Sequence, residues 1–146
     1  MPLHKTDFHL DELYPILSEV IASGGEFRLY PRGTSMKPLL REGRDSVALV
    51  APDRLKRGDI LLYRRTDGHF VLHRLLCVEK DMTLTFCGDN QSRLEKGITP
   101  DAVIARVAYI WRDDKRISPD SLRYRAYRFA TVTPPVRALR VGRKLY

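Results

Sequence analysis

This sequence contains little cysteine and no long apolar run, and we find no secretory leader in it. It has two cysteines among 146 residues, and no Cys-x-x-Cys pair or His/Cys cluster accompanies them. This scarcity argues against a disulfide framework and a zinc site, and we expect no metal or other cofactor. No run reaches the roughly 18 apolar residues of a membrane-spanning helix, and the N-terminus lacks the basic-then-apolar order of a secretory signal. The sequence therefore predicts a cytoplasmic protein with reduced thiols.

Acidic residues are scarce in the last quarter of the chain. Residues 112–146 hold ten Lys and Arg but three Asp and Glu, whereas residues 1–111 hold sixteen basic and fifteen acidic side chains. The net charge of +8 is therefore concentrated at the C-terminal end. Such a segment suits an anionic partner, namely a lipid surface, a nucleic acid or an acidic protein. The alternative is a solvated charged surface without a partner.

Length and composition indicate one folded domain. Apolar residues make up 43% of the chain and charged residues 30%, as in ordinary globular proteins, and 146 residues suffice for one core. The patterns divide the chain into an N-terminal helix in 1–25, a β domain in 26–111 and a basic tail in 112–146.

The apolar pattern changes from a helical to a strand period at a double glycine. Apolar residues spaced by three and four predict a helix over 7–22, ended by Gly24-Gly25, although Pro15 favours a bend or a later start. Short β-type runs separated by turn signals follow, and they favour a compact, mostly antiparallel β domain. The strands are expected at 26–30, 46–50, 59–63, 69–78, 83–87 and 102–111.

The basic tail contains a second helical pattern. Ser118-Pro119 is a favourable helix start, and a helix over 120–131 would carry aromatic residues among arginines. That combination suits the interface of an anionic membrane, so peripheral membrane contact is one expectation. We expect no nucleic-acid partner, because no helix-turn-helix fits the residues before Gly33.

Ser35 is the candidate nucleophile. Gly33 permits a tight backbone path before it, Pro38 restricts the chain after it, and Leu39-Leu40 can anchor the loop in the core. Such rigidity is what a nucleophile requires. The alternative is an ordinary solvated hydroxyl.

His73 is the candidate general base for Ser35. Of the four histidines, it alone lies inside an apolar strand-like run, residues 70–76. A half-buried, neutral imidazole is what a base at neutral pH requires, although a core histidine bonded to the backbone is the alternative. An acid could hold the ring in the correct tautomer, and the candidates are Asp89, in the turn after the next strand, and Glu95.

Four motifs in this order resemble the clan of serine peptidases that includes the signal peptidases and the self-cleaving SOS-type repressors. They extend over about residues 33–108, roughly half of the chain. They are Gly33-Thr34-Ser35-Met36-Lys37-Pro38, similar to the nucleophile box; Arg57-Gly58-Asp59-Ile60-Leu61, similar to a Gly-Asp-apolar strand; Leu72-His73-Arg74, similar to the box of the base; and Cys87-Gly88-Asp89-Asn90, similar to the Gly-Asp-Asn box.

The resemblance implies a serine endopeptidase with a signal-peptidase-like β domain that cleaves a peptide or leader after small residues. It makes Ser35 the nucleophile and His73 the base, with support from Asp89 or Glu95. The histidine is similar to the archaeal and endoplasmic-reticulum types, because the bacterial-type enzymes and the repressors have lysine there. Gly33 stands where many members have Ser or Thr, so the oxyanion hole is expected to consist of backbone N–H groups.

One departure from the family affects the expected function. Signal peptidases of this type begin with a membrane-spanning helix, which we do not find here, so we expect a relative that acts on a dedicated peptide. Two alternatives stay open: a non-catalytic module of the same fold that binds peptides or partners, and a regulator that cleaves itself. The sequence leaves the oligomeric state open.

Overall fold

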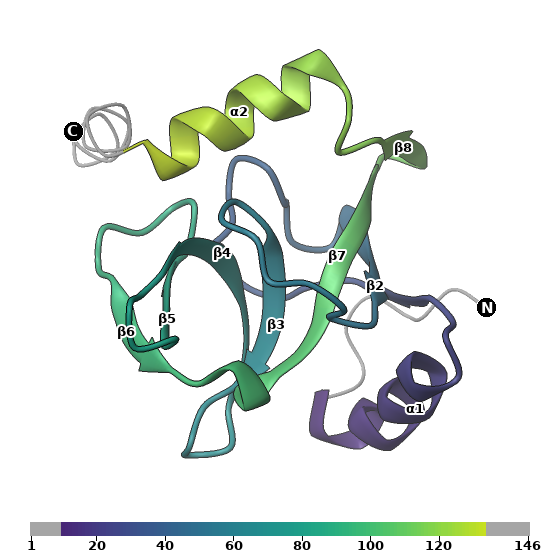
Figure 1. The fold of residues 1–146 in the computed structure, drawn as a ribbon. Helices are drawn as coiled ribbons and strands as arrows, with labels where there is room; N and C mark the ends of the chain where they lie inside the picture. The colour runs from purple at the N-terminus through teal and green to yellow at the C-terminus, as the bar shows by residue number, and fades with distance from the viewer. Residues whose placement is uncertain (1–9, 134–146) are drawn as a thin grey trace.

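The computed structural model describes residues 10–133, which form one curled antiparallel sheet with a helix near each end of the chain (Figure 1). The elements in order are α1 (Leu10–Ala22), β1 (Phe27–Leu29), β2 (Asp45–Val50), β3 (Ile60–Arg64), β4 (Phe70–Val78), β5 (Leu84–Cys87), β6 (Glu95–Ile98), a short 3-10 helix (Pro100–Ala102), β7 (Val103–Arg112), β8 (Lys115–Ile117) and α2 (Leu122–Val132).

The sheet has the strand order β1-β2-β7-β3-β4-β5-β6, and β8 pairs with β7. All neighbours are antiparallel. In the β3–β4 hairpin Leu61 lies opposite His73 and Tyr63 lies opposite Val71. Facing positions on paired strands share one face, so these four side chains project to the same side.

Two apolar clusters fill the two sides of the curled sheet. Successive side chains of a strand point to opposite faces. Accordingly β3 contributes Ile60 and Leu62 to one cluster, and Leu61 and Tyr63 to the other. This is why residues 60–63 of β3 are buried on both faces, whereas Arg64 is exposed.

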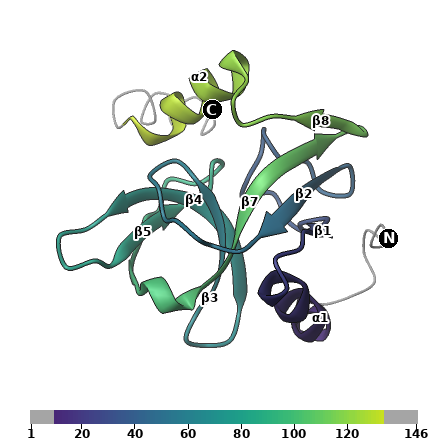
Figure 2. The same cartoon turned by 45° about the vertical axis from the view of Figure 1, so that its right-hand side comes forward.

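The helices lie at different ends of the domain. α1 lies beside β1 and β2, and α2 crosses the opposite end, as Figures 1 and 2 show. Leu13 and Leu17 of α1 and Tyr124 of α2 all belong to the first cluster. No helix within residues 10–133 is long and apolar enough to cross a membrane.

The predicted fold class is confirmed: the protein is mostly antiparallel β, with an N-terminal and a C-terminal helix. The six expected strands are present, with ends that differ by at most one residue. Residues 7–9 of the expected first helix lie outside the described part, and Pro15 is accommodated inside α1.

Two short strands and one helix start differ from the prediction. β6 and β8 have weak strand composition, and they exist because they pair with β5 and β7. The expected boundary at residue 112 therefore falls where β7 continues into the turn to β8. Ser118 forms a local turn by accepting from Asp120 N, so Ser121 caps α2 instead.

Candidate active site

The loop that carries Ser35 is anchored by the apolar residues that follow it. Met36, Leu39 and Leu40 are buried in the first cluster, as predicted for the last two. Gly33 adopts a φ of +85°, a left-handed conformation that glycine reaches without strain. Ser35 is therefore held between a glycine turn and a buried apolar segment.

The Gly-Asp-Asn turn clamps this loop from one side. Asn90 donates its backbone N–H to Ser35 O at 2.8 Å and its side-chain amide to Thr34 O at 3.0 Å. Gly88 lies so close that a Cβ there would be 2.6 Å from Ser35 O. A glycine is required at 88 because any side chain would push Ser35 away.

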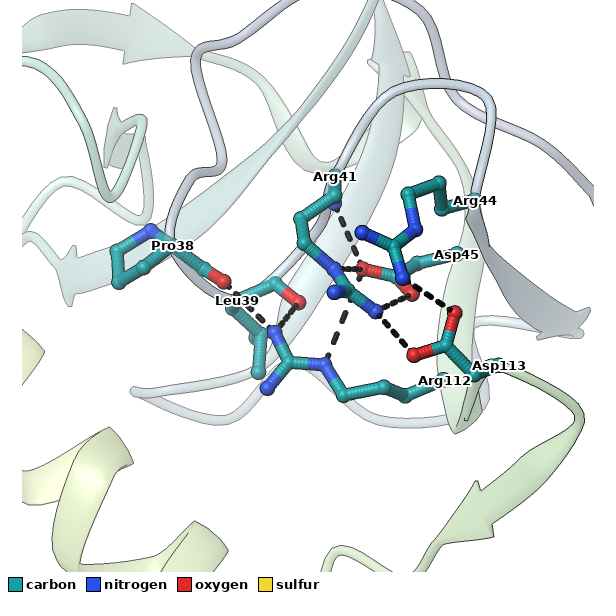
Figure 3. A network of polar contacts seen from close by, with 7 residues as sticks. All are labelled: Pro38, Leu39, Arg41, Arg44, Asp45, Arg112 and Asp113. Carbon is teal, nitrogen blue, oxygen red and sulfur yellow. Dashed lines mark hydrogen bonds and ion pairs between the residues drawn. The ribbon is translucent and has the colours of Figure 1, made fainter.

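An arginine network holds the loop from the other side (Figure 3). Arg112 donates to the carbonyl oxygens of Pro38 at 2.7 Å and Leu39 at 2.8 Å. Beside it, the buried Asp45 accepts from the guanidinium of Arg41 at 2.9 Å. Burial alone would raise the pKa of Asp45, but the Arg41 side chain and N–H lower it below its usual value.

Ser35 and His73 line the same cavity, of about 260 Å³, whose apolar lining includes Met36, Leu40 and Leu72. Among residues 10–133, neither the hydroxyl nor the N–H of Ser35 makes a hydrogen bond, so both are available to a ligand. His73 is 6% exposed. Burial lowers its pKa to about 4, so the imidazole is neutral at neutral pH.

Tyr63 connects His73 to Glu95. The Tyr63 hydroxyl lies 3.4 Å from His73 Nδ1 and donates to Glu95 Oε1 at 2.6 Å. Arg65 donates to both carboxylate oxygens of Glu95, at 2.8 and 2.9 Å. These Arg65 hydrogen bonds are the main reason that the pKa of Glu95 is lowered, so Glu95 is an ionised acceptor.

This arrangement selects one tautomer of His73. Burial raises the pKa of Tyr63 well above its usual value, so Tyr63 keeps its proton. That proton is donated to Glu95, which leaves the Tyr63 oxygen as an acceptor for His73 Nδ1. The imidazole proton then lies on Nδ1, and Nε2 keeps the lone pair that a general base requires.

Asp89 has a different environment from the one expected. Its carboxylate accepts from Arg74 at 2.7 and 3.1 Å, and both side chains are fully buried. Tyr127 of α2 also donates to Asp89, at 2.9 Å. Because Arg74 follows His73 on β4, the two side chains point to opposite faces. The expected contact between Asp89 and the His73 ring is not formed, and Glu95 reaches the ring through Tyr63.

Tyr63 and Arg65 were not among the predicted site residues. A signal for Tyr63 was present in the sequence: Asp67-Gly68 is a typical hairpin turn, and closing the hairpin there places Tyr63 on the same face as His73. Nothing in the local pattern around Arg65 indicated an ion pair with Glu95, 30 positions away.

The chain matches no protein-family model, no curated protein and no solved structure. The interpretation of the site therefore depends on its motifs and its geometry. No group of three or more potential metal-ligating His, Cys, Asp or Glu side chains occurs among residues 10–133. The Ser35 hydroxyl has no hydrogen bond to His73 or to any other group among residues 10–133, and it lines one cavity with the neutral imidazole. The arrangement suits acid–base and nucleophilic chemistry once a substrate lies between the two side chains.

Proposed function

We propose that this protein is a serine endopeptidase of the signal-peptidase-like type, in which Ser35 is the nucleophile and His73 is the general base. The observation that carries the proposal is that these two residues, 38 positions apart in the sequence, line one cavity. The Tyr63 hydroxyl at His73 Nδ1 supports it, because it leaves Nε2 as the basic nitrogen.

The proposed reaction has two stages. Ser35 Oγ attacks the peptide carbonyl carbon and its proton passes to His73 Nε2, while the oxyanion accepts from backbone N–H groups that include Ser35 N–H. The C–N bond then breaks, and Nε2 returns the proton to the leaving amine. Water, deprotonated by His73, hydrolyses the acyl ester and restores Ser35. The preference for a small side chain beside the bond follows from the resemblance of the motifs and not from the cavity volume of about 260 Å³.

The proposal is tested with a peptide library that varies the residues around the scissile bond. Ser35→Ala and His73→Ala should each lower kcat/KM by on the order of a thousandfold or more, and the double variant should be no worse than either. Ser18→Ala and His69→Ala, at exposed positions, are the matched controls. Wild-type protein that cleaves no peptide and forms no adduct with a peptidyl boronate would overturn the proposal and favour the non-catalytic binding module.

The third candidate, a self-cleaving regulator, is separated by the intact mass of the purified protein. Self-processing would shorten the wild type and leave Ser35→Ala at full length. A full-length wild type that cleaves added peptides supports action on a separate substrate.

We further propose that α2 binds an anionic membrane surface. Leu122 and Phe129 are 80% and 65% exposed and lie on a different face of α2 from the buried Tyr124. The nearby Arg123 and Arg125 are also exposed. Exposed apolar side chains among arginines suit a negatively charged interface. A cytoplasmic location, as expected from the sequence, would place this surface near anionic lipids. The residues after 133 lie outside the described part.

α2 also contributes to the core of the β domain. Tyr124 belongs to the first cluster and Tyr127 donates to Asp89, so deleting the tail would also disturb the β domain. Point variants are therefore the better test. Leu122→Ser with Phe129→Ser should reduce binding to phosphatidylserine vesicles, whereas the control Ile16→Ser with Met82→Ser, also exposed, should not. Equal binding by both pairs would overturn the membrane proposal.

A further inference from the structure

Two cavities meet at the candidate base. The first contains Ser35 and has a volume of about 260 Å³. The second, of about 780 Å³, extends along residues 90–96. Arg65, His73 and Gln91 line both cavities. A peptide held at Ser35 and passing His73 would therefore contact the lining of both.

Basic side chains dominate this combined lining. Arg32 lines the first cavity, Arg93 and Lys96 line the second, and Arg65 lines both. Glu95 is the one acidic side chain among these lining residues, and both its oxygens already accept from Arg65. Glu95 and Arg65 therefore neutralise each other.

Once Arg65 is paired with Glu95, three positively charged side chains of the cavity lining have no acidic partner in the described part of the chain. Arg32, Arg93 and Lys96 are exposed and form no ion pair within residues 10–133. Residues 1–111 together carry sixteen basic and fifteen acidic side chains, so three uncompensated cations around one site are a local concentration. Arg32 lines one cavity, Arg93 and Lys96 line the other, and His73 lines both.

We propose that the substrate is an acidic peptide, with Asp or Glu on both sides of the small residues at the cleavage position. This inference rests on the proposed peptidase function and adds the substrate class to it. The apolar lining at Met36 and Leu40 suits a small uncharged side chain, whereas the outer cations attract carboxylates. An exposed ion pair changes affinity about 1.4- to 5-fold, so three together should contribute about tenfold, less at high salt.

Binding to Ser35→Ala tests this inference without requiring cleavage. Three fluorescent peptides share the same small central residues and carry flanking Glu, Gln or Lys. Anisotropy titrations at low salt should give the Glu peptide about a tenfold lower Kd than the Gln peptide, and the Lys peptide the highest. In 0.5 M salt the difference should shrink to about twofold or less.

A charge-matched pair of variants locates the effect. Arg32→Gln, Arg93→Gln and Lys96→Gln together, in the Ser35→Ala background, should abolish the preference for Glu. Lys80→Gln, Lys115→Gln and Arg123→Gln together remove the same charge from exposed positions outside both cavities, and should keep the preference. Equal Kd values for the three peptides, no binding of any peptide, or an equal loss in both triple variants would overturn the inference.

Wild-type assays with the same peptides separate the two proposals. Selective binding of the Glu peptide without cleavage of any peptide would overturn the peptidase function and leave the acidic-ligand site standing. Cleavage of all three peptides at equal kcat/KM would overturn the acidic substrate and leave the peptidase standing.

Discussion

Two arginine–carboxylate pairs lie on opposite faces of the β3–β4 hairpin and have different roles. Arg74 and Asp89 are both fully buried and connect the sheet to the nucleophile-side turn and to α2. Arg65 and Glu95 are partly exposed and connect to His73 through Tyr63. The first pair fixes the turn that contacts the Ser35 carbonyl, whereas the second is connected by hydrogen bonds through Tyr63 to Nδ1 of the candidate base.

The difference shows that a turn expected to supply a chemical group can instead determine the shape of its neighbours. The Gly-Asp-Asn turn would be expected to supply the acid that supports the base. Here its Asp89 is held by Arg74, and its neighbours Gly88 and Asn90 contact the Ser35 carbonyl. The acid that reaches His73 through Tyr63 is Glu95 of β6, an element with little sequence signal.

The largest expected effect is a loss of stability when the buried Arg74–Asp89 pair is broken. Asp89→Asn leaves Arg74 as an uncompensated buried charge, which should lower the free energy of unfolding by about 3–5 kcal/mol, measured by urea denaturation. Arg74→Met combined with Asp89→Leu should recover part of this loss, because both charges are removed together. Asp89→Asn with full stability but strongly reduced kcat would return Asp89 to the role of an acid that supports His73.

Gly88→Ala tests the turn without altering either pair. The new Cβ would lie 2.6 Å from Ser35 O, so we expect a destabilisation of about 1–3 kcal/mol, typical of overpacking, together with reduced cleavage as the Ser35 loop shifts. Gly68→Ala, in the β3–β4 turn at a φ of +93°, is the control: it should lower stability through backbone strain and leave kcat unchanged. Equal kcat in the two variants would contradict the clamping role of Gly88.

Tyr63→Phe tests the hydrogen-bond relay from the Arg65–Glu95 pair through the Tyr63 hydroxyl to His73. Without the hydroxyl, His73 Nδ1–H loses its acceptor and the Nε2–H tautomer becomes more populated, so kcat should fall about 10- to 100-fold, part of the usual general-base contribution. Imidazole ¹⁵N shifts report the tautomer directly. Glu95→Gln should have a smaller effect, because the amide oxygen can still accept from Tyr63. Tyr109→Phe is the control, and an unchanged tautomer in Tyr63→Phe would refute the relay.

The smallest effect is a pH shift. Because burial lowers the pKa of His73 to about 4, cleavage should rise with pH around a midpoint near 4 and not near 6.5. Glu95 raises the pKa of His73 by its charge, so Glu95→Gln should move this midpoint to lower pH. A wild-type midpoint at or above about 6.5 would show that His73 is not buried as described.

The same pKa has a consequence for stability. As the pH falls from about 6.5 to about 4, the unfolded chain gains a proton at His73 before the folded protein does. Stability should therefore be complete above 6.5 and decline below it, by at most about 1.4 kcal/mol per pH unit. Trp111 fluorescence in denaturant titrations at each pH separates this unfolding from the loss of catalysis.

Much of the fold could be predicted because its signals are local. The apolar spacing of α1, the six strands and the turn at Asp67-Gly68 are properties of short segments, and the structure has the six strands within one residue. β6 could not be predicted, because Glu-Lys-Gly-Ile forms a strand only against β5. The same limit applies to the exposed Leu122 and Phe129, since only the packing of Tyr124 decides which face of α2 is outward.

The sequence by itself determined the N-terminal helix, the six expected strands, the anchored loop around Ser35 and the position of His73 inside a strand, because each depends on neighbours in the chain. The tertiary structure alone decided which acid is connected to His73 by hydrogen bonds. Because side chains alternate along β4, His73 and Arg74 point to opposite faces. Asp89 therefore forms an ion pair with Arg74, whereas Glu95 accepts from Tyr63 on the face of His73. That choice is set by strand register and pairing over long sequence distances, which no local pattern encodes.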